Sequence, residues 1–294
     1  MWNLEQSELL TSPIKCRLQT TYPTINTVVD IVAINKSDMV KQTRLSPLEV
    51  DSINSSIFSL CKNDAKTLIS LIRDETTSPS IILNDPVLDS VLGDSVLKHD
   101  VTVVSGYPGI GKTQFTMSIV CQCLSQKKPC LYINSGCNLV IDRIIEILTS
   151  LGADIDSSLS LLYIENSFDA YELYDILEKF QSKFESECWG CVVIDSMTPF
   201  FQPLMIQDYL HGRVMMSHIL QQLRWIARTF RIPVIMTMQV RRDSTATLHP
   251  SNNFFVDSII YMIKLENERV LQLVKSSSKS TPLCVPFVIK KNGF

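Results

Sequence analysis

The stretch at residues 101–114 limits the fold more than any other part of the chain, because it joins an apolar run to a glycine-rich turn and the start of a helix. Gly106, Gly111, Lys112 and Thr113 match the phosphate-loop pattern G-x-x-x-x-G-K-[ST]. Glycines let such a loop curl so that its backbone N–H groups face an anion, and the positive end of the helix adds to that field. The lysine of the pattern reaches outer phosphates and the hydroxyl ligates Mg²⁺. The sequence therefore predicts a nucleotide site.

Downstream of this loop, apolar β-branched runs alternate with helical patterns, which is typical of a parallel α/β sheet. We predict core strands at 101–105, 130–134, 161–164, 191–195 and 234–239. Helices are predicted near 112–126, 140–151, 169–185 and 211–230, and a short helix around 88–92. Runs at 258–265, 270–275 and 285–289 have short connections, so they predict antiparallel strands at one edge. The predicted fold class is α/β, a phosphate-loop ATPase core with a mainly parallel sheet flanked by helices.

The N-terminal part of the chain carries no catalytic motif and predicts a small all-α domain. Ser46 is a predicted helix N-cap, with Pro47 at the first helical position and Glu49 at the third. On physical grounds alone, such a domain is either a packed cap or a docking module. A polar stretch follows it and indicates a linker. We expect a helical docking domain at 1–73, a linker at 74–80 and the nucleotide-binding core at 81–294.

Composition excludes several classes of protein. The formal net charge of −3 argues against a broad basic surface and against strong, sequence-independent DNA binding by this chain alone. No apolar run is long enough to span a membrane, and the N-terminus lacks the basic start of a signal peptide. A local basic loop remains compatible with this charge.

The nine cysteines are an odd number scattered among core-like positions, which indicates a reducing compartment. Cys188 and Cys191 form a C-x-x-C pair, but the pair leads into a strand and no second pair completes a zinc site. A structural role is therefore favoured for it. The four histidines have no ligand spacing, so we expect no metal site made by protein side chains alone.

A second candidate ligand for the nucleotide's metal ion is Asp195, which ends the apolar run at 191–195. In phosphate-loop NTPases, a carboxylate at the end of a core strand holds Mg²⁺ through its coordinated water. Strands often end in Asp before a turn, so the position of Asp195 indicates a Mg²⁺ ligand only in combination with the phosphate-loop pattern at 101–114.

Four pieces of the chain, SGYPGIGKTQ, LYINSG, VVIDS and VIMTMQV, occur in the order and spacing that resemble the RecA-like recombinases. Further pieces, among them TVVDIVAINKSDMV, ENSFDAYELYDILEKF, VVIDSMTPFFQPL and LVKSSSKS, look like the D-type paralogue of the eukaryotic strand-exchange protein. The similarity spans about residues 25 to 280. It implies a RecA-like ATPase core behind a small N-terminal all-α domain.

The resemblance assigns roles residue by residue. It implies that Asp195 is the Mg²⁺-associated carboxylate beside Thr113, and that Gln239 senses the terminal phosphate and relays it to a DNA-facing loop. Arg143 falls where the family places an arginine over the adenine, although an exposed helix arginine is an equal alternative. The implied ligands of ATP and Mg²⁺ are Gly106, Gly109, Gly111, Lys112, Thr113, Gln114, Arg143 and Asp195.

One departure from the family pattern concerns catalysis. The family's hydrolytic glutamate orients the attacking water just after the second strand, where this chain has Gly136, and Asn134 replaces a usual Asp. No nearby carboxylate restores the function. Losing a group that positions the nucleophile costs about 10²- to 10⁴-fold in rate, so ATP binding is better supported than brisk hydrolysis and no catalytic residue is assigned.

The family's two DNA loops correspond to residues near 203–212 and 240–255. The second loop contains Arg241 and Arg242 with aromatic residues at its end, a combination that grips a backbone and stacks on bases. It also holds Asp243, and a solvated arginine pair is the commoner case.

The resemblance implies a nuclear mediator of homologous recombination and double-strand-break repair, without membrane attachment. It would act in a hetero-oligomer of recombinase paralogues and help load or stabilise the main strand-exchange recombinase on single-stranded DNA. The alternatives are a free-standing phosphate-loop NTPase that acts on a small molecule, and a scaffold whose nucleotide is structural.

Overall fold

The chain divides into two compact units, Met1–Glu75 and Thr76–Phe294. The computed structural model describes residues 14, 18, 20–22, 31, 34, 36–43, 45–61, 81–83, 85–92, 98–136, 139–240, 252–265, 268–290 and 293. The predicted linker at 74–80 lies outside these residues. The proposed division at 1–73, 74–80 and 81–294 remains a prediction.

The first unit contains helices α3 (Lys36–Thr43) and α4 (Pro47–Cys61). The predicted cap of α4 is confirmed, because the backbone N–H of Glu49 donates to Ser46 Oγ at 3.2 Å and the N–H of Ser46 donates to Glu49 Oε2 at 2.7 Å. The helices bury a small apolar cluster formed by Leu18, Ile31, Met39, Leu45, Val50 and Ile53.

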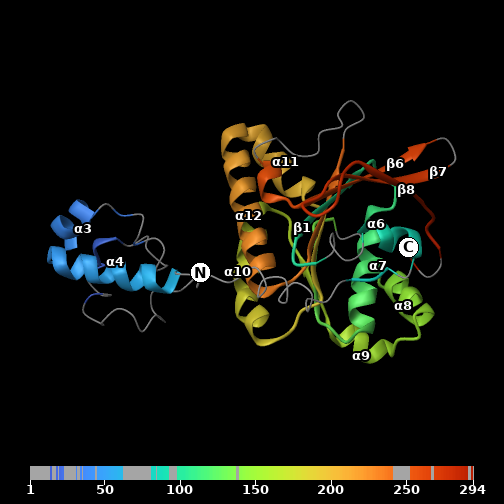
Figure 1. Ribbon diagram of the computed structural model, residues 1–294, viewed down its shortest axis with the longest axis horizontal. Coiled ribbons are helices and arrows are strands. Elements are labelled where there is room, and N and C mark those ends of the chain that lie inside the picture. Colours follow the sequence, from blue (N-terminus) through green and yellow to red (C-terminus); the bar gives the residue numbers. More distant parts are fainter. Residues whose placement is uncertain are drawn as a thin grey trace. The chain divides into compact units, whose positions relative to one another are not determined.

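The second unit is built on one eight-stranded sheet with the order β3-β2-β4-β5-β1-β6-β7-β8 (Figure 1). Neighbouring strands from β3 to β6 run parallel, and β7 and β8 add antiparallel strands at one edge. The strands are β1 (Val101–Gly106), β2 (Cys130–Asn134), β3 (Leu162–Asn166), β4 (Cys191–Asp195), β5 (Val234–Gln239), β6 (Ser258–Leu265), β7 (Glu268–Lys275) and β8 (Leu283–Phe287). The predicted sheet and its antiparallel edge are confirmed.

Helices cover both faces of this sheet (Figure 1). On one face lie α6 (Pro86–Leu92), α7 (Lys112–Ser125), α8 (Ile141–Ser150) and α9 (Ile155–Ser160). On the other lie α10 (Ala170–Ser186), α11 (Thr198–Gln207) and α12 (Tyr209–Phe230), and η1 (Asn252–Phe255) packs on α12. Each helical layer encloses its own apolar core, so the central strands are buried on both sides as parallel strands require.

The predicted first DNA loop at 203–212 is wrong as a loop, because these residues form the end of α11 and the start of α12. Phe200 and Phe201 are buried in the core, which holds α11 in place across Pro203. Asp208 then caps α12 by accepting hydrogen bonds from the backbone N–H groups of Leu210 and His211. The Asp208 cap of α12 and the two buried aromatic side chains of α11 thus stabilise these helices in spite of the helix-breaking tendency of Pro203.

Of the helices in the described parts of the chain, none combines the length and apolar character that crossing a membrane requires.

Candidate nucleotide site

The predicted phosphate loop joins the carboxyl end of β1 to the first residue of α7, Lys112. Gly109 and Gly111 have φ values of 76° and 117°, a region that favours glycine, so the loop needs both. A Cβ added to Gly106 would lie 2.6 Å from the carbonyl oxygen of Met262 on β6. The strand and loop therefore pack too closely for a side chain at this position, and the loop opens beyond the carboxyl ends of parallel strands, where α/β sheets bind ligands.

Lys112 is buried at the base of the loop, and its Nζ donates hydrogen bonds of 2.9 Å to the carbonyl oxygens of Gly106 and Tyr107. Burial lowers the pKa of Lys112, and the charge of Asp195 opposes this shift. A phosphate group beside the ammonium would favour its charged form further. The side chain is thus already held within the loop and has a buried positive charge that an anion would stabilise.

Asp195, at the end of β4, is surrounded by hydroxyl donors. Its Oδ2 accepts from Thr113 Oγ1 at 2.7 Å and from the Tyr132 hydroxyl at 2.9 Å. Its Oδ1 accepts a short hydrogen bond from Thr237 Oγ1. The carboxylate and the Thr113 hydroxyl, predicted together as Mg²⁺ ligands, are therefore in direct contact. They offer the oxygen atoms that Mg²⁺ prefers.

Tyr132 and Thr237 were missed by the sequence analysis. Tyr132 lies on β2 and Thr237 on β5, the two strands that flank β4, so the sheet order brings both hydroxyls to Asp195. Burial, and then the charge of Asp195, raise the pKa of Tyr132 well above its ordinary value, so the hydroxyl stays a donor. The sequence offered one sign of their role, because each is a hydroxyl-bearing residue in the interior of a mainly apolar run, Tyr132 in 130–134 and Thr237 in 234–239.

A cavity of about 380 Å³ opens next to these groups. Its walls are Pro108, Gly109, Gly111, Lys112, Thr113, Gln114, Ser135, Gly136, Asp195, Ser196, Pro199, Gln239 and Ile289. Among the described residues that line it, Asp195 is the one carboxylate. Gly136, at the predicted position of the hydrolytic glutamate, lies in the wall and contributes no side chain.

Gln239 ends β5 and its exposed side chain lies at the cavity wall. Its backbone N–H donates to Thr198 Oγ1 at 2.9 Å, and the N–H of Val240 donates to the carbonyl oxygen of Gly106 at 3.4 Å. These bonds fix the start of the second predicted DNA loop to α11 and to the phosphate loop. The predicted phosphate sensor is therefore placed between the cavity and that loop.

Arg143, on α8, does not line the cavity but ties its wall together. Its Nε donates to Gln114 Oε1 at 2.9 Å, and its Nη2 donates to the carbonyl oxygen of Lys290 at 2.6 Å. An ion pair with Glu146 completes the arrangement, and only 16% of the arginine side chain is exposed. This environment differs from the exposed helix arginine that was the alternative. The predicted contact with adenine stays a prediction.

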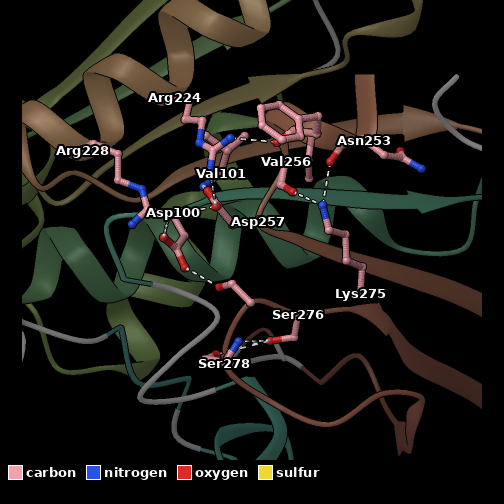
Figure 2. Close-up of polar contacts among 12 residues, drawn as sticks. Asp100, Val101, Arg224, Arg228, Asn253, Val256, Asp257, Lys275, Ser276 and Ser278 are labelled. Carbon is pink, nitrogen blue, oxygen red and sulfur yellow. Dashed lines mark hydrogen bonds and ion pairs between the residues drawn. The ribbon is translucent and has the colours of Figure 1, made fainter. Parts of the chain in front are cut away.

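The far end of the second predicted DNA loop is fixed by cations (Figure 2). Arg224 on α12 donates to the carbonyl oxygen of Phe254 at 2.7 Å, and Lys275 on β7 donates to the carbonyl oxygens of Asn253 and Val256. The ring of Phe254 is 75% exposed, with the Arg224 guanidinium 5.6 Å from its centre. Arg241 and Arg242, the predicted DNA contacts, lie outside the described residues.

Two buried acids complete this cluster (Figure 2). Asp257 accepts from the backbone N–H of Val101 at 3.0 Å and from Arg228 at 2.8 Å, and Arg228 also pairs with Asp100 at 3.0 Å. Burial, with a contribution from the neighbouring Asp257, raises the pKa of Asp100. The cluster joins β1, β7 and α12 to the segment that follows the loop. That segment is therefore anchored to the same strand that carries the phosphate loop.

Comparison with known proteins places these features in a family. A family model described as Rad51 matches residues 80–259. The chain belongs to the Rad51 family. It is similar to a protein named "DNA repair protein RAD51 homolog 4" from Bos taurus, with 24% identity over 279 residues, 86% of this chain and 84% of that protein. The Mus musculus protein of the same name is 24% identical over 230 residues, 74% of this chain and 70% of that protein.

A protein named "DNA repair and recombination protein RadB" from Pyrococcus abyssi is also similar, with 30% identity over 164 residues, 55% of this chain and 68% of that protein. The predicted resemblance to RecA-like recombinases and their paralogues is thus confirmed, and the RecA-like fold class with it.

We predict that Lys112→Ala weakens ATP binding by about 10- to 100-fold, since a hydrogen bond to a charged group contributes about 1.5–3 kcal/mol. Labelled-nucleotide titration measures the affinity, and circular dichroism checks that the fold persists. Lys179→Ala is the matched control, because Lys179 is 62% exposed and pairs with Glu165 instead of lining the cavity. Equal affinity of Lys112→Ala and the parent chain would contradict the phosphate-loop assignment.

Proposed function

We propose that this chain is an ATP-binding recombinase paralogue that serves homologous recombination and DNA repair. The observation that carries the proposal is the contact of Thr113 with Asp195 at a cavity lined by Lys112, in a chain of the Rad51 family. The names of its relatives, which refer to DNA repair and to recombination, support the same role.

ATP with Mg²⁺ is the ligand that this donor set fits best. Lys112 and the loop backbone would hold the outer phosphates, while Thr113 and Asp195 would hold the metal ion. When bound, the metal ion neutralises charge on the outer phosphates. Gln114, braced by Arg143, would form part of the wall on the side where the base is expected.

A mediator role in a hetero-oligomer accounts for the remaining features. The N-terminal helical unit carries no nucleotide-binding motif, which suits a docking module for other recombinase paralogues. Gln239 lies between the cavity and the segment that contains Arg241 and Arg242, which suits a relay from nucleotide to single-stranded DNA. In this role the chain works in the nucleus, with the main strand-exchange recombinase as a further partner.

Slow hydrolysis is part of the proposal. Phosphoryl transfer needs a positioned nucleophile as well as charge neutralisation. Lys112, Thr113 and Asp195 meet the second need, and the oxygens of Asp195 already accept bonds from three hydroxyls. ATP would then act as a conformational clamp at a subunit boundary, and a partner would be free to contribute a catalytic group in trans.

Affinity purification of the tagged chain from cells that express it naturally tests the mediator role. We expect other recombinase paralogues in stoichiometric amounts, identified by mass spectrometry, and faster loading of the main recombinase on single-stranded DNA by the resulting complex. Recovery of the chain alone, with Lys112-dependent turnover of a small molecule, would instead favour the free-standing NTPase. A stable complex whose loading activity is unchanged by Lys112→Ala would favour the scaffold.

We predict that the purified chain hydrolyses ATP well below about 1 s⁻¹, the low end of ordinary enzyme rates, with or without single-stranded DNA. Gly136→Glu returns a carboxylate to the cavity wall and should raise turnover, whereas the matched variant Gly136→Gln should not. Steady-state phosphate release measures both, with Lys112→Ala as background. Lys112-dependent turnover near 1 s⁻¹ in the parent chain, or equal rates for the two Gly136 variants, would show that Gly136 does not limit hydrolysis.

A further inference from the structure

Three cysteines from separate parts of the sequence meet at the end of the sheet opposite the nucleotide cavity. Cys130 is the first residue of β2 and Cys191 the first residue of β4, and the two are paired in register on these neighbouring parallel strands. Cys123 comes from the last turn of α7, which packs on this face of the sheet. The C-x-x-C spacing of Cys188 and Cys191 could not predict the group, because two members come from other elements, and the site proposed below departs from the expectation of no metal site made by protein side chains alone.

The three sulfur atoms lie within 4.8 Å of one another, and the Sγ atoms of Cys130 and Cys191 are 3.7 Å apart. An ion at the centre of three sulfurs, with metal–sulfur bonds of about 2.3 Å, would set the sulfurs about 4.0 Å apart. The sulfurs therefore need shifts of less than about 1 Å to surround one ion. Each of the three side chains is buried, with at most 2% exposed.

Gly190 makes room for this arrangement. A Cβ at this position would lie 2.6 Å from the Cβ of Cys123 and 3.1 Å from its Sγ. It would also lie 3.1 Å from the Cβ of Lys128, so a basic residue is packed beside the group. A side chain at residue 190 would push Cys123 away from the other two sulfurs. The glycine that precedes Cys191 is therefore needed for the three sulfurs to converge.

We propose that Cys123, Cys130 and Cys191 form a binding site for one thiophilic metal ion of the Cu(I) or Zn(II) class, held by three sulfurs. Thiolate ligands select these soft or borderline ions over Mg²⁺ and Ca²⁺. Each thiol that binds as a thiolate releases its proton to solvent, and the ion offsets only part of the resulting negative charge, because three thiolates leave a net charge of about −2 with Cu(I) and about −1 with Zn(II). Among the described residues the group has three members, which favours Cu(I), because structural zinc sites use four ligands.

The proposed metal site lies on the same helix and strand that supply the nucleotide-binding residues. Helix α7 begins with Lys112 and Thr113 and carries Cys123 near its end, whereas β4 begins with Cys191 and ends with Asp195. An ion that joins the sulfurs would tie together the two elements that supply the nucleotide-binding residues. Loading should therefore raise the melting temperature of the core, because an ion that binds only the folded chain stabilises it by mass action.

The test titrates the reduced, metal-free full-length chain with Cu(I) or Zn(II), each against a chromophoric competitor chelator under anaerobic conditions. Elemental analysis after desalting gives the stoichiometry, and the sulfur-to-metal absorption band reports thiolate ligation. We expect one tightly bound equivalent of Cu(I). One equivalent of Zn(II) instead would also support the three-sulfur site and assign its ion.

Variants locate the ion. Cys123→Ala, Cys130→Ala and Cys191→Ala should each weaken binding at least about 100-fold, the upper end of what outer-shell changes cost at metal sites. Cys121→Ala is the matched control: this buried cysteine is on the same helix, but its thiol donates to the carbonyl oxygen of Ile144. Cys188→Ala and Cys284→Ala control for exposed thiols. The three controls should bind like the parent chain.

A measurement on the parent chain tests the site even if the cysteine variants fail to fold. In mild denaturant, the loaded ion should slow alkylation of Cys123, Cys130 and Cys191, mapped by peptide mass spectrometry, more than it slows alkylation of Cys121, which is protected only through the added stability of the fold. The proposal is overturned if the reduced chain retains no ion, if protection falls equally on all cysteines, or if a Cys130–Cys191 disulfide forms in place of ion binding.

Discussion

The hydrogen bonds around the Asp195 carboxylate are the interaction on which the rest of the nucleotide site depends. Thr113 on α7, Tyr132 on β2 and Thr237 on β5 all donate to this one group, so a single half-buried carboxylate joins a helix to three adjacent strands. A carboxylate in a protein interior is stable only when its oxygens are satisfied. The three hydroxyls meet this requirement and hold the phosphate loop and its helix against the sheet.

The sequence predicted the parts of this site that are local along the chain. The phosphate loop is a contiguous pattern, and Asp195 closes an apolar run, so both could be named in advance. Tyr132 and Thr237 could not, because their role arises from the strand order, which puts β4 between β2 and β5. The same limit applies to Cys123, Cys130 and Cys191. Helix α11 was missed because residues 203–212 were assigned as a loop from the family resemblance, whereas buried Phe200 and Phe201 anchor a helix there.

The absence of a glutamate at Gly136 gives the proposed function its particular character. Among the described residues that line the cavity, Asp195 is the one carboxylate, which suits the holding of ATP better than its rapid turnover. Both ends of the segment that follows Gln239 are tied to the core, at the phosphate loop and at the Asp257 cluster. The two anchors therefore connect this segment to the strand and loop that form the nucleotide site.

The most direct test of this account is the Mg²⁺ dependence of ATP binding, measured by calorimetric titration of the full-length chain in Mg²⁺ and in EDTA. Asp195→Asn keeps the shape of the side chain and removes its charge. The account predicts that the parent chain binds ATP more tightly in Mg²⁺, and that Asp195→Asn loses this gain while it retains the affinity measured in EDTA. An unchanged gain from Mg²⁺ in Asp195→Asn would contradict the assignment of this carboxylate as the centre of the site.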